Sequence, residues 1–299
     1  MPAGLRTWIL AARPRTLSAA VVPVLVGTAL AVERNAFRAL PAIAALVGAI
    51  AIQIGTNFAN DYSDAVRGTD SERRGPTRVT QAGLVTERAM RAAIAIAFGV
   101  SVLCGVYLVG VGGWPILVLG ILSIVSGLAY TGGPYPLGYH GLGEVFVLAF
   151  FGLGAVAGTY YVQAGHLILP AILLSAPVGL FSVAILVANN LRDIETDRRA
   201  GKMTLAARFG HRFGAAEYAA ALLLAYLTPA ALAIARALPA GSLLCLLSLP
   251  LAIPLLRIAH RADATLAEHL RLLAGTSRLF LVFGLLLGAG LLLDAGLLL

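Results

Sequence analysis

Charged residues are scarce in this chain. They make up 12% of its 299 residues, whereas a soluble domain carries about 25%. Hydrophobic residues make up 59%, and the mean hydropathy is +0.89. Cysteine is also nearly absent, and its two copies, Cys104 and Cys245, fall inside apolar segments. The shortage of charge excludes an ordinary soluble domain, and the shortage of cysteine argues against both a disulfide framework and a zinc site.

Apolar runs recur along the whole sequence, each near the roughly 20 residues that cross a bilayer as a helix. A signal peptide before a soluble domain would give only one such run. We therefore predict an all-α integral membrane protein with nine transmembrane helices. The predicted helices cover residues 17–33, 39–62, 88–109, 115–131, 143–163, 168–190, 214–235, 239–260 and 276–299.

Basic residues are distributed unevenly over the connections between these helices. The four long connections cover residues 63–87, 132–142, 191–213 and 261–275. With nine helices they lie on the same side as the N-terminus, and that side holds all but Arg34, Arg38 and Arg236 of the 22 basic residues. The positive-inside rule places this side in the cytoplasm and the C-terminus outside a cell (inner or plasma) membrane. The net charge of +8 thus reflects membrane topology, and we expect no nucleic-acid partner.

Two similar acidic clusters end two of the predicted helices. The first reads "NFANDYSD" over 57–64, and the second reads "NNLRDIETD" over 189–197. A basic, glycine-containing connection follows each, so that 57–70 and 189–202 form a weak internal repeat. Both clusters lie at predicted cytoplasmic helix ends, and we expect them to confront each other across a central cavity.

Residues three and four apart share one face of a helix, so each cluster forms a polar stripe. One stripe comprises Asn57, Asp61 and Asp64, and the other comprises Asn190, Asp193 and Asp197. Carboxylates brought this close repel one another unless a cation lies between them. Their hard oxygen atoms suit Mg²⁺, which often bridges carboxylates to substrate phosphates, and nearby Arg and Lys side chains can bind those phosphates.

This pattern favours an enzyme that acts on a lipid diphosphate, with Mg²⁺ assisting departure of the diphosphate. Two other interpretations remain open. The acids can be charges solvated at helix ends, or they can mark an ion or proton pathway in a transporter. A transporter more often has its acids near mid-membrane, whereas these lie at helix ends among basic residues.

The same motifs resemble those of the UbiA-type intramembrane prenyltransferases. The resemblance is carried by 8–31, by 57–86, by "YTGGPYPLGYHGLGEVFVLAFFG" over 130–152, and by "NNLRDIETDRRAGKMTLAARFG" over 189–210. Within the family, "GPTRVTQAG" and "YTGGPYPLGYHGLGE" are most similar to the branch that prenylates 1,4-dihydroxy-2-naphthoate. The resemblance implies one transmembrane domain over 1–299 whose helices surround a central cavity under a cytoplasmic cap. It also implies transfer from polyprenyl diphosphate with loss of carbon dioxide, which gives a demethylmenaquinol and diphosphate.

The resemblance also implies roles for individual residues. Asn57, Asp61 and Asp64 would hold one Mg²⁺ ion, and Asp193 and Asp197 a second, so that the four aspartates are the expected catalytic residues. Expected diphosphate contacts are Arg78, Lys202, Arg192 and Arg198. Asp70 departs from the family spacing, and a loop-ordering role is open for it beside metal binding.

A third group is expected near the acceptor or the allylic cation. It comprises Asn60, Tyr62, Tyr130, Tyr139, His140, Glu144 and Asn190. Each tyrosine can instead anchor its helix at the membrane interface. Glu144 can instead be a charge that stabilises a helix N-terminus, and His140 can be a solvated loop residue. The acceptor itself has alternatives in 4-hydroxybenzoate, homogentisate and a glycerol-phosphate lipid.

Overall fold

A computed structural model describes residues 4–67 and 78–294, so Asp70 lies outside the described residues. Every regular element in these ranges is helical. The α-helices are α1 Leu5–Ala12, α2 Ser18–Glu33, α3 Ala39–Arg67, α4 Glu87–Gly112, α5 Trp114–Ala129, α6 Gly143–Val147, α7 Gly158–Ala164, α8 Leu169–Arg199, α9 Leu205–Phe209, α10 His211–Ile234, α11 Leu249–His260 and α12 Leu266–Asp294. Between them lie the 3-10 segments η1 Pro14–Thr16, η2 Leu137–Tyr139 and η4 Ala240–Ser248, and the π-helical segment η3 Leu148–Ala157.

The predicted all-α membrane architecture is confirmed, and each of the nine predicted segments falls on helix. Within the described residues, seven helical segments are long and apolar enough to cross a bilayer. An eighth arises if α1–η1 and α2, which are bent by 54°, are taken together. Helix α5 has 16 residues, fewer than the roughly 20 that a bilayer requires. The count of nine spans therefore stays a prediction.

Two predicted connections are wrong in their bounds. Helix α8 continues to Arg199 instead of ending at residue 190, and α12 begins at Leu266 instead of residue 276. In both places the helix extends into a charged stretch. Hydropathy falls at the membrane boundary, whereas backbone hydrogen bonding in a helix does not depend on the polarity of exposed side chains.

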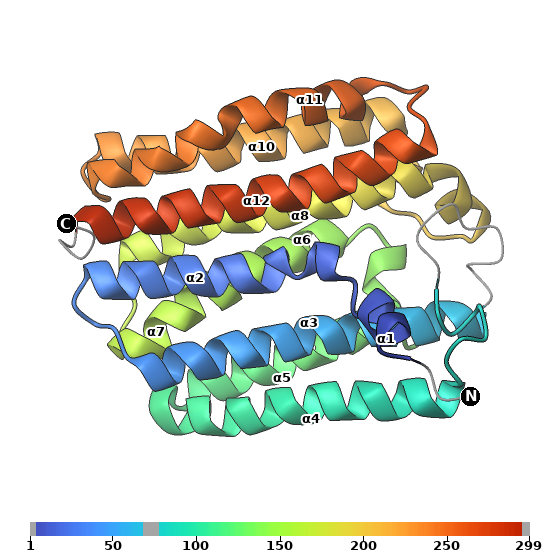
Figure 1. Cartoon of the computed structure of the whole chain (residues 1–299), viewed down its shortest axis with the longest axis horizontal. Helices are drawn as coiled ribbons and strands as arrows, with labels where there is room; N and C mark the ends of the chain where they lie inside the picture. The colour runs from blue at the N-terminus through green and yellow to red at the C-terminus, as the bar shows by residue number, and fades with distance from the viewer. Residues whose placement is uncertain (1–3, 68–77, 295–299) are drawn as a thin grey trace.

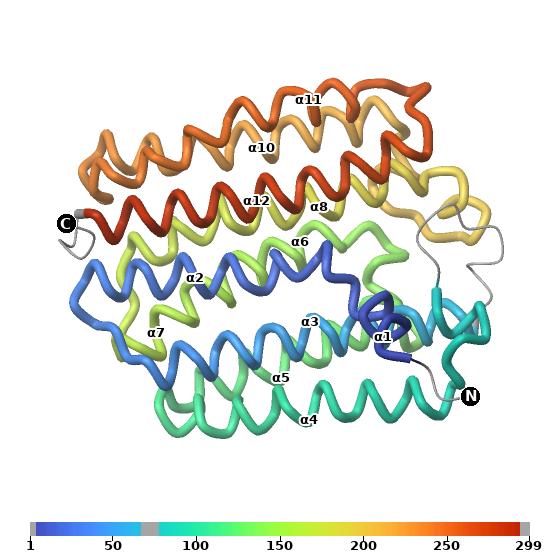
Figure 2. Tube along the Cα trace, viewed as in Figure 1, coloured from blue at the N-terminus to red at the C-terminus, as the bar shows by residue number. Residues whose placement is uncertain are grey.

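The long helices lie side by side and run back and forth along one axis (Figure 1). Helices α3 and α8 both finish at the end of the bundle where α1 lies, whereas α12 finishes at the opposite end. The trace in Figure 2 shows that the chain leaving α8 turns back at the same end as the chain entering α4. The two acidic clusters are thereby brought to one end of the molecule.

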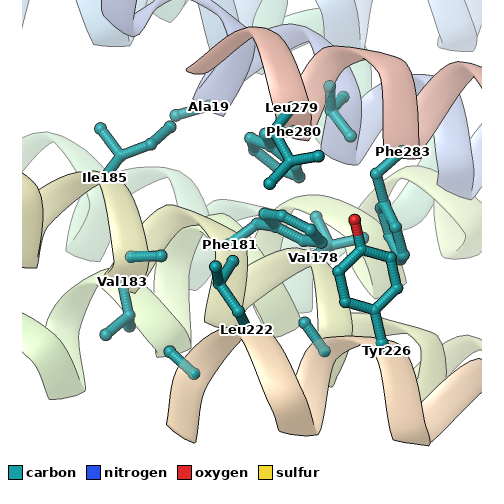
Figure 3. Close-up of a cluster of buried hydrophobic side chains, with 14 of the residues drawn as sticks. Ala19, Val178, Phe181, Val183, Ile185, Leu222, Tyr226, Leu279, Phe280 and Phe283 are labelled. Carbon is teal, nitrogen blue, oxygen red and sulfur yellow. The ribbon is translucent and has the colours of Figure 1, made fainter. Parts of the chain in front are cut away.

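The core is built around α8. In its most apolar window 72% of the residues are buried, compared with 11% for the peripheral helix α4. Phe181 of α8 stacks on Phe280 with ring centroids 5.3 Å apart and contacts Phe283 at 4.5 Å. Figure 3 shows these rings meeting Tyr226 between α8, α10 and α12. The end of α8 therefore projects from the most firmly packed part of the protein.

The π-helical segment η3 packs closely against α8. A methyl group added at Gly152 would approach the Ser175 carbonyl oxygen to 2.7 Å and the Cα atom of Gly179 to 3.0 Å. Small residues allow this backbone approach between membrane helices. The contact fixes the helix that begins at Gly143 against α8, and so fixes the loop that precedes it.

Candidate functional site

Asp61 holds the backbone of a loop. Its Oδ2 atom accepts a hydrogen bond from the Val79 amide at 3.1 Å, and its Oδ1 atom accepts one from the Thr80 amide at 3.0 Å. The Asp61 side chain is buried, with 2% of the residue exposed. In the structure this predicted metal ligand therefore binds the start of the turn that leads into α4.

One helical turn further along α3, Asp64 binds a side chain from the same loop. The Nη2 atom of Arg78 donates to Asp64 Oδ2 at 2.5 Å, and both residues are buried. Charged hydrogen bonds of this kind are short and strong. The structure thus brings together one predicted metal ligand and one predicted diphosphate contact.

Asn57 and Tyr62 face other parts of the chain. The Asn57 amide donates to the Ala12 carbonyl at 2.9 Å and to Thr16 Oγ1 at 3.2 Å. Asn57 therefore ties α3 to the end of α1. Tyr62 packs against the small apolar cluster that contains Val79. Their predicted roles toward metal and toward the acceptor or allylic cation stay predictions.

At the end of α8 each acid also has a basic partner. Arg192 binds both oxygens of Asp193, with Nε at 2.7 Å from Oδ1 and Nη2 at 2.5 Å from Oδ2. Lys202 Nζ lies 3.3 Å from Asp197 Oδ1. Asp193 and Asp197 are one helical turn apart and both are buried. The second cluster therefore presents two acid–base pairs on one face.

Arg198 points elsewhere. Its Nε atom donates to the Ala207 carbonyl oxygen at 2.6 Å, and its Nη1 atom lies 3.5 Å from Glu195 Oε1. The Arg198 side chain is 42% exposed, and its contact with diphosphate stays a prediction.

Acids of both clusters lie near the loop that follows α5. The carboxylates of Asp64 and Asp197 both lie near enough to act electrostatically on the Tyr130 hydroxyl, as does Glu144. That hydroxyl packs on Gly143, where an added methyl group would lie 2.8 Å from the Tyr130 oxygen. One acid from each cluster therefore lies in the neighbourhood of Tyr130, and the confrontation of the two clusters across a cavity stays a prediction.

Thr131 is a member of this site that the sequence analysis missed. Its hydroxyl donates to Asn60 Oδ1 at 2.7 Å, which joins the α5 loop to α3. Asn60 is one turn before Asp64, on the face directed at Tyr130 rather than at α1. The signal for Thr131 was its position directly after Tyr130 in the quoted loop motif.

Glu144 and Asn190 form the corresponding link to α8. Asn190 Nδ2 donates to Glu144 Oε1 at 3.0 Å, and Lys202 acts electrostatically on the same carboxylate. Glu144 belongs to the first turn of α6, where a negative charge is favoured by the helix dipole. The pair places a carboxylate and an amide beside the second acidic cluster.

The remaining predicted residues, Tyr139 and His140, lie in the same loop. The Tyr139 carbonyl oxygen accepts a hydrogen bond from the Met203 amide at 2.9 Å, which joins the α5–α6 connection to the chain after α8. The His140 ring stacks on Tyr135 with centroids 3.6 Å apart, and its Nδ1 atom lies 2.8 Å from the Pro136 carbonyl oxygen. His140 therefore stabilises the loop fold.

Known proteins are similar to this chain over most of its length. The chain is 44% identical to the 1,4-dihydroxy-2-naphthoate octaprenyltransferase of Mycobacterium leprae, over 68% of this chain and 69% of that protein. It is 43% identical to the Escherichia coli protein of the same name, over 76% of each chain.

Solved structures show the same fold at lower identity. A UbiA homologue from Aeropyrum pernix aligns with a TM-score of 0.65 at 20% identity, over 93% of this chain and 97% of that one. The UbiA homologue from Archaeoglobus fulgidus bound to GPP and Mg²⁺ aligns with a TM-score of 0.62 at 15% identity, over 95% and 99%. The model of the UbiA prenyltransferase family matches residues 20–282. With its helical membrane fold and its two acidic clusters, the chain belongs to the UbiA prenyltransferase family.

Proposed function

We propose that the protein transfers a polyprenyl group from polyprenyl diphosphate to 1,4-dihydroxy-2-naphthoate. The bond between the allylic carbon and the diphosphate oxygen breaks, a bond to the naphthoate ring forms, and carbon dioxide and diphosphate leave. The products are a demethylmenaquinol, carbon dioxide and diphosphate. The observation that carries the proposal is that α3 and α8 bring their acidic clusters to the same end of the bundle, where Asp64 and Asp197 are each paired with a base.

The acids at this end fit divalent metal ions. Asp64, Asp193 and Asp197 provide buried carboxylate oxygens, and hard oxygen donors are what Mg²⁺ prefers. We assign one Mg²⁺ ion to Asp64, with Asn60 as a neutral oxygen ligand, and a second to Asp193 and Asp197. Bound there, the ions would neutralise charge on the departing diphosphate. Asp61 is placed outside this set, because both of its carboxylate oxygens accept hydrogen bonds from backbone amides. Asn57 stays a candidate neutral ligand through its Oδ1 atom, since its bonds to Ala12 and Thr16 are made by the amide nitrogen.

The bases of the same pairs are suited to hold the diphosphate. Arg78 and Lys202 come from the two loops that cover the clusters, and Arg192 comes from α8 itself. The Nη1 atom of Arg192 is buried and has no hydrogen-bond partner among residues 4–67 and 78–294. A buried donor left unpaired is costly, and a phosphate oxygen would satisfy it. Substrate binding then amounts to an exchange of partners, in which each base turns from a carboxylate to a phosphate oxygen.

Glu144 and Asn190 are suited to hold the acceptor. Asn190 binds the Oε1 atom of the Glu144 carboxylate, and the second carboxylate oxygen, Oε2, is the atom that we propose for the acceptor. A hydroxyl of the naphthoate can donate to that oxygen, which increases electron density on the ring for attack on the allylic carbon. Tyr130 lies near this carboxylate and near one acid of each cluster and can present its ring to the developing positive charge.

The membrane setting matches an insoluble prenyl chain. The apolar helices form a multi-pass membrane protein, and we place the acidic end on the cytoplasmic side, the C-terminus outside, and the whole chain in one domain with an Asp-rich motif at each half. The distribution of basic residues supports this orientation. Dihydroxynaphthoate would reach the site from water, and polyprenyl diphosphate from the bilayer; the diphosphate product would leave to water.

The test is a reconstituted assay. Purified protein in lipid nanodiscs is mixed with Mg²⁺, a polyprenyl diphosphate and dihydroxynaphthoate, and the extract is examined by mass spectrometry for the decarboxylated prenyl product. 4-Hydroxybenzoate, homogentisate and a glycerol-phosphate lipid compete in parallel reactions. If the protein prenylates one of these acceptors faster than dihydroxynaphthoate, that acceptor replaces dihydroxynaphthoate as the proposed substrate. Movement of a substrate into liposomes without any covalent product would show that the protein is a transporter and not an enzyme.

A further inference from the structure

The turn that carries Arg78 is capped from another helix. Within the turn, the Ala82 amide donates to the Arg78 carbonyl at 3.0 Å and the Leu84 amide donates to the Val79 carbonyl at 2.9 Å. The first amides of such a turn have no acceptor inside it. Those amides belong to Val79 and Thr80, and both donate to Asp61.

The same turn is fixed on its other side by apolar packing. Val79 is fully buried in a cluster with Phe58 of α3, Met90 of α4 and Ala11 of α1. Asp61 and this cluster together hold the backbone at the residue directly after Arg78. Because Asp61 and Asp64 are three residues apart on α3, one acid binds the backbone of the turn and the other binds the Arg78 side chain.

We propose that Asp61 is a positioning residue for Arg78 and not a metal ligand. The inference rests on the proposed function for the role of Arg78 toward diphosphate. Turning the Asp61 carboxylate to a metal ion would take the acceptors from the buried Val79 amide and the partly buried Thr80 amide, and an unpaired buried donor is costly. Asp64, by contrast, binds Arg78 at the end of a long side chain that can move.

The first measurement needs neither metal nor substrate. Hydrogen exchange, resolved to single amides by fragmentation in the mass spectrometer, is followed on metal-free protein in nanodiscs. In the wild type the Val79 and Thr80 amides should exchange at least about 100-fold more slowly than in an unstructured peptide, as amides held in buried hydrogen bonds do. Free exchange of these amides in the wild type would overturn the proposal, whether or not any variant folds.

The variant pair is Asp61→Asn and Asp64→Asn, which are isosteric changes one turn apart on α3. Asparagine at 61 keeps one acceptor oxygen but turns an NH₂ group toward the second amide. We expect exchange across 79–85 to rise at least about tenfold in D61N and to stay at the wild-type rate in D64N. Unchanged exchange in D61N would contradict the assignment.

The second measurement separates positioning from metal binding. In the transfer assay D61N should keep the wild-type half-saturating Mg²⁺ concentration and raise KM for polyprenyl diphosphate, whereas D64N should raise the Mg²⁺ requirement. The double variant D61N/R78M should be no worse than R78M alone, since both changes remove the same contact. A raised Mg²⁺ requirement in D61N would restore Asp61 to the metal site. If the wild type makes no prenyl product while the exchange pattern holds, the proposed function fails and the positioning of Arg78 by Asp61 stands.

Discussion

The two acidic clusters achieve the same pairing of acids and bases by different means. On α8 the bases are close in sequence: Arg192 is adjacent to Asp193, and Lys202 follows Asp197 by one short turn. On α3 the base for Asp64 is Arg78, which arrives from the far end of the connection to α4. The α8 cluster projects from the core, whereas the α3 cluster depends on a loop packed at the periphery.

This difference indicates how the two halves should respond to change. Charges on α8 are enclosed by packing that the rest of the fold maintains, so loss of one partner leaves the other buried. On the α3 side the base is the end of the long Arg78 side chain, which can turn away when its acid is lost. Substitutions on α8 are therefore expected to reduce both stability and activity, and those on the α3 side mainly activity.

Removal of divalent metal should have the largest effect on activity. Chelation with EDTA should reduce transfer at least about 1,000-fold, because charge on the departing diphosphate would be poorly neutralised. The thermal unfolding midpoint should stay unchanged, since each acid already has a basic partner. Activity should return on addition of Mg²⁺. A large fall in the midpoint on chelation would show instead that metal holds the two clusters together.

Asp193→Ala should combine a large loss of activity with a loss of stability. Arg192 is 2% exposed at its side chain, and an ionic partner removed from a buried pair costs about 3–5 kcal/mol. We expect activity to fall about 100-fold or more and the unfolding midpoint to fall clearly. Asp64→Ala should lower activity similarly but stability less, because the long Arg78 side chain can turn its charge toward water.

A double variant provides the matched control. Arg192→Met with Asp193→Leu replaces the buried pair by apolar side chains of similar size, which is often neutral or stabilising. It should recover the unfolding midpoint of the wild type while remaining inactive. Equal destabilisation by Asp193→Ala and Asp64→Ala would remove the contrast between the core cluster and the loop cluster.

The sequence predicts the membrane fold and the acids at its active end, because apolar runs and paired aspartates are local patterns. It does not predict where helices end: α8 runs on to Arg199 through a charged stretch that hydropathy excludes. Nor does it predict which atoms each acid binds. Asp61 and Asp64 look equivalent on a helical face, yet one binds the amides of Val79 and Thr80 and the other a guanidinium. That distinction depends on the path of a loop between helices, and the spacing of residues within one helix does not predict that path.

Arg78→Met and Lys202→Met compare the two loop bases directly. Arg78 is buried, whereas the Lys202 side chain is 24% exposed, and contacts to charged groups are stronger when water is excluded. We expect KM for polyprenyl diphosphate to rise about 100-fold for R78M and about tenfold for K202M, in keeping with 1.5–3 kcal/mol for charged hydrogen bonds. The reverse order would place the diphosphate closer to α8 than to α3.

Lys202 also allows a test without mutation, because it is the only lysine in the chain. Reductive methylation keeps its positive charge but reduces its hydrogen-bond donors. The modified protein should show a smaller rise in KM than K202M, about threefold, since the ion pair with Asp197 would survive. Prior incubation with Mg²⁺ and inorganic diphosphate should protect Lys202 from modification. Absence of protection would argue against a diphosphate contact there.

Arg198→Ala should have the smallest effect of the series. The Arg198 side chain is 42% exposed and binds the Ala207 carbonyl and Glu195. An exposed ion pair contributes less than about 1 kcal/mol, and surface substitutions away from a site change free energies by about 0.5 kcal/mol or less. KM for polyprenyl diphosphate should therefore stay within about twofold of the wild type, measured beside K202M under the same conditions. A tenfold rise in this KM would mean that Arg198 moves toward the diphosphate when substrate binds. The α8 cluster would then, like the α3 cluster, depend on a connection between helices for one of its bases.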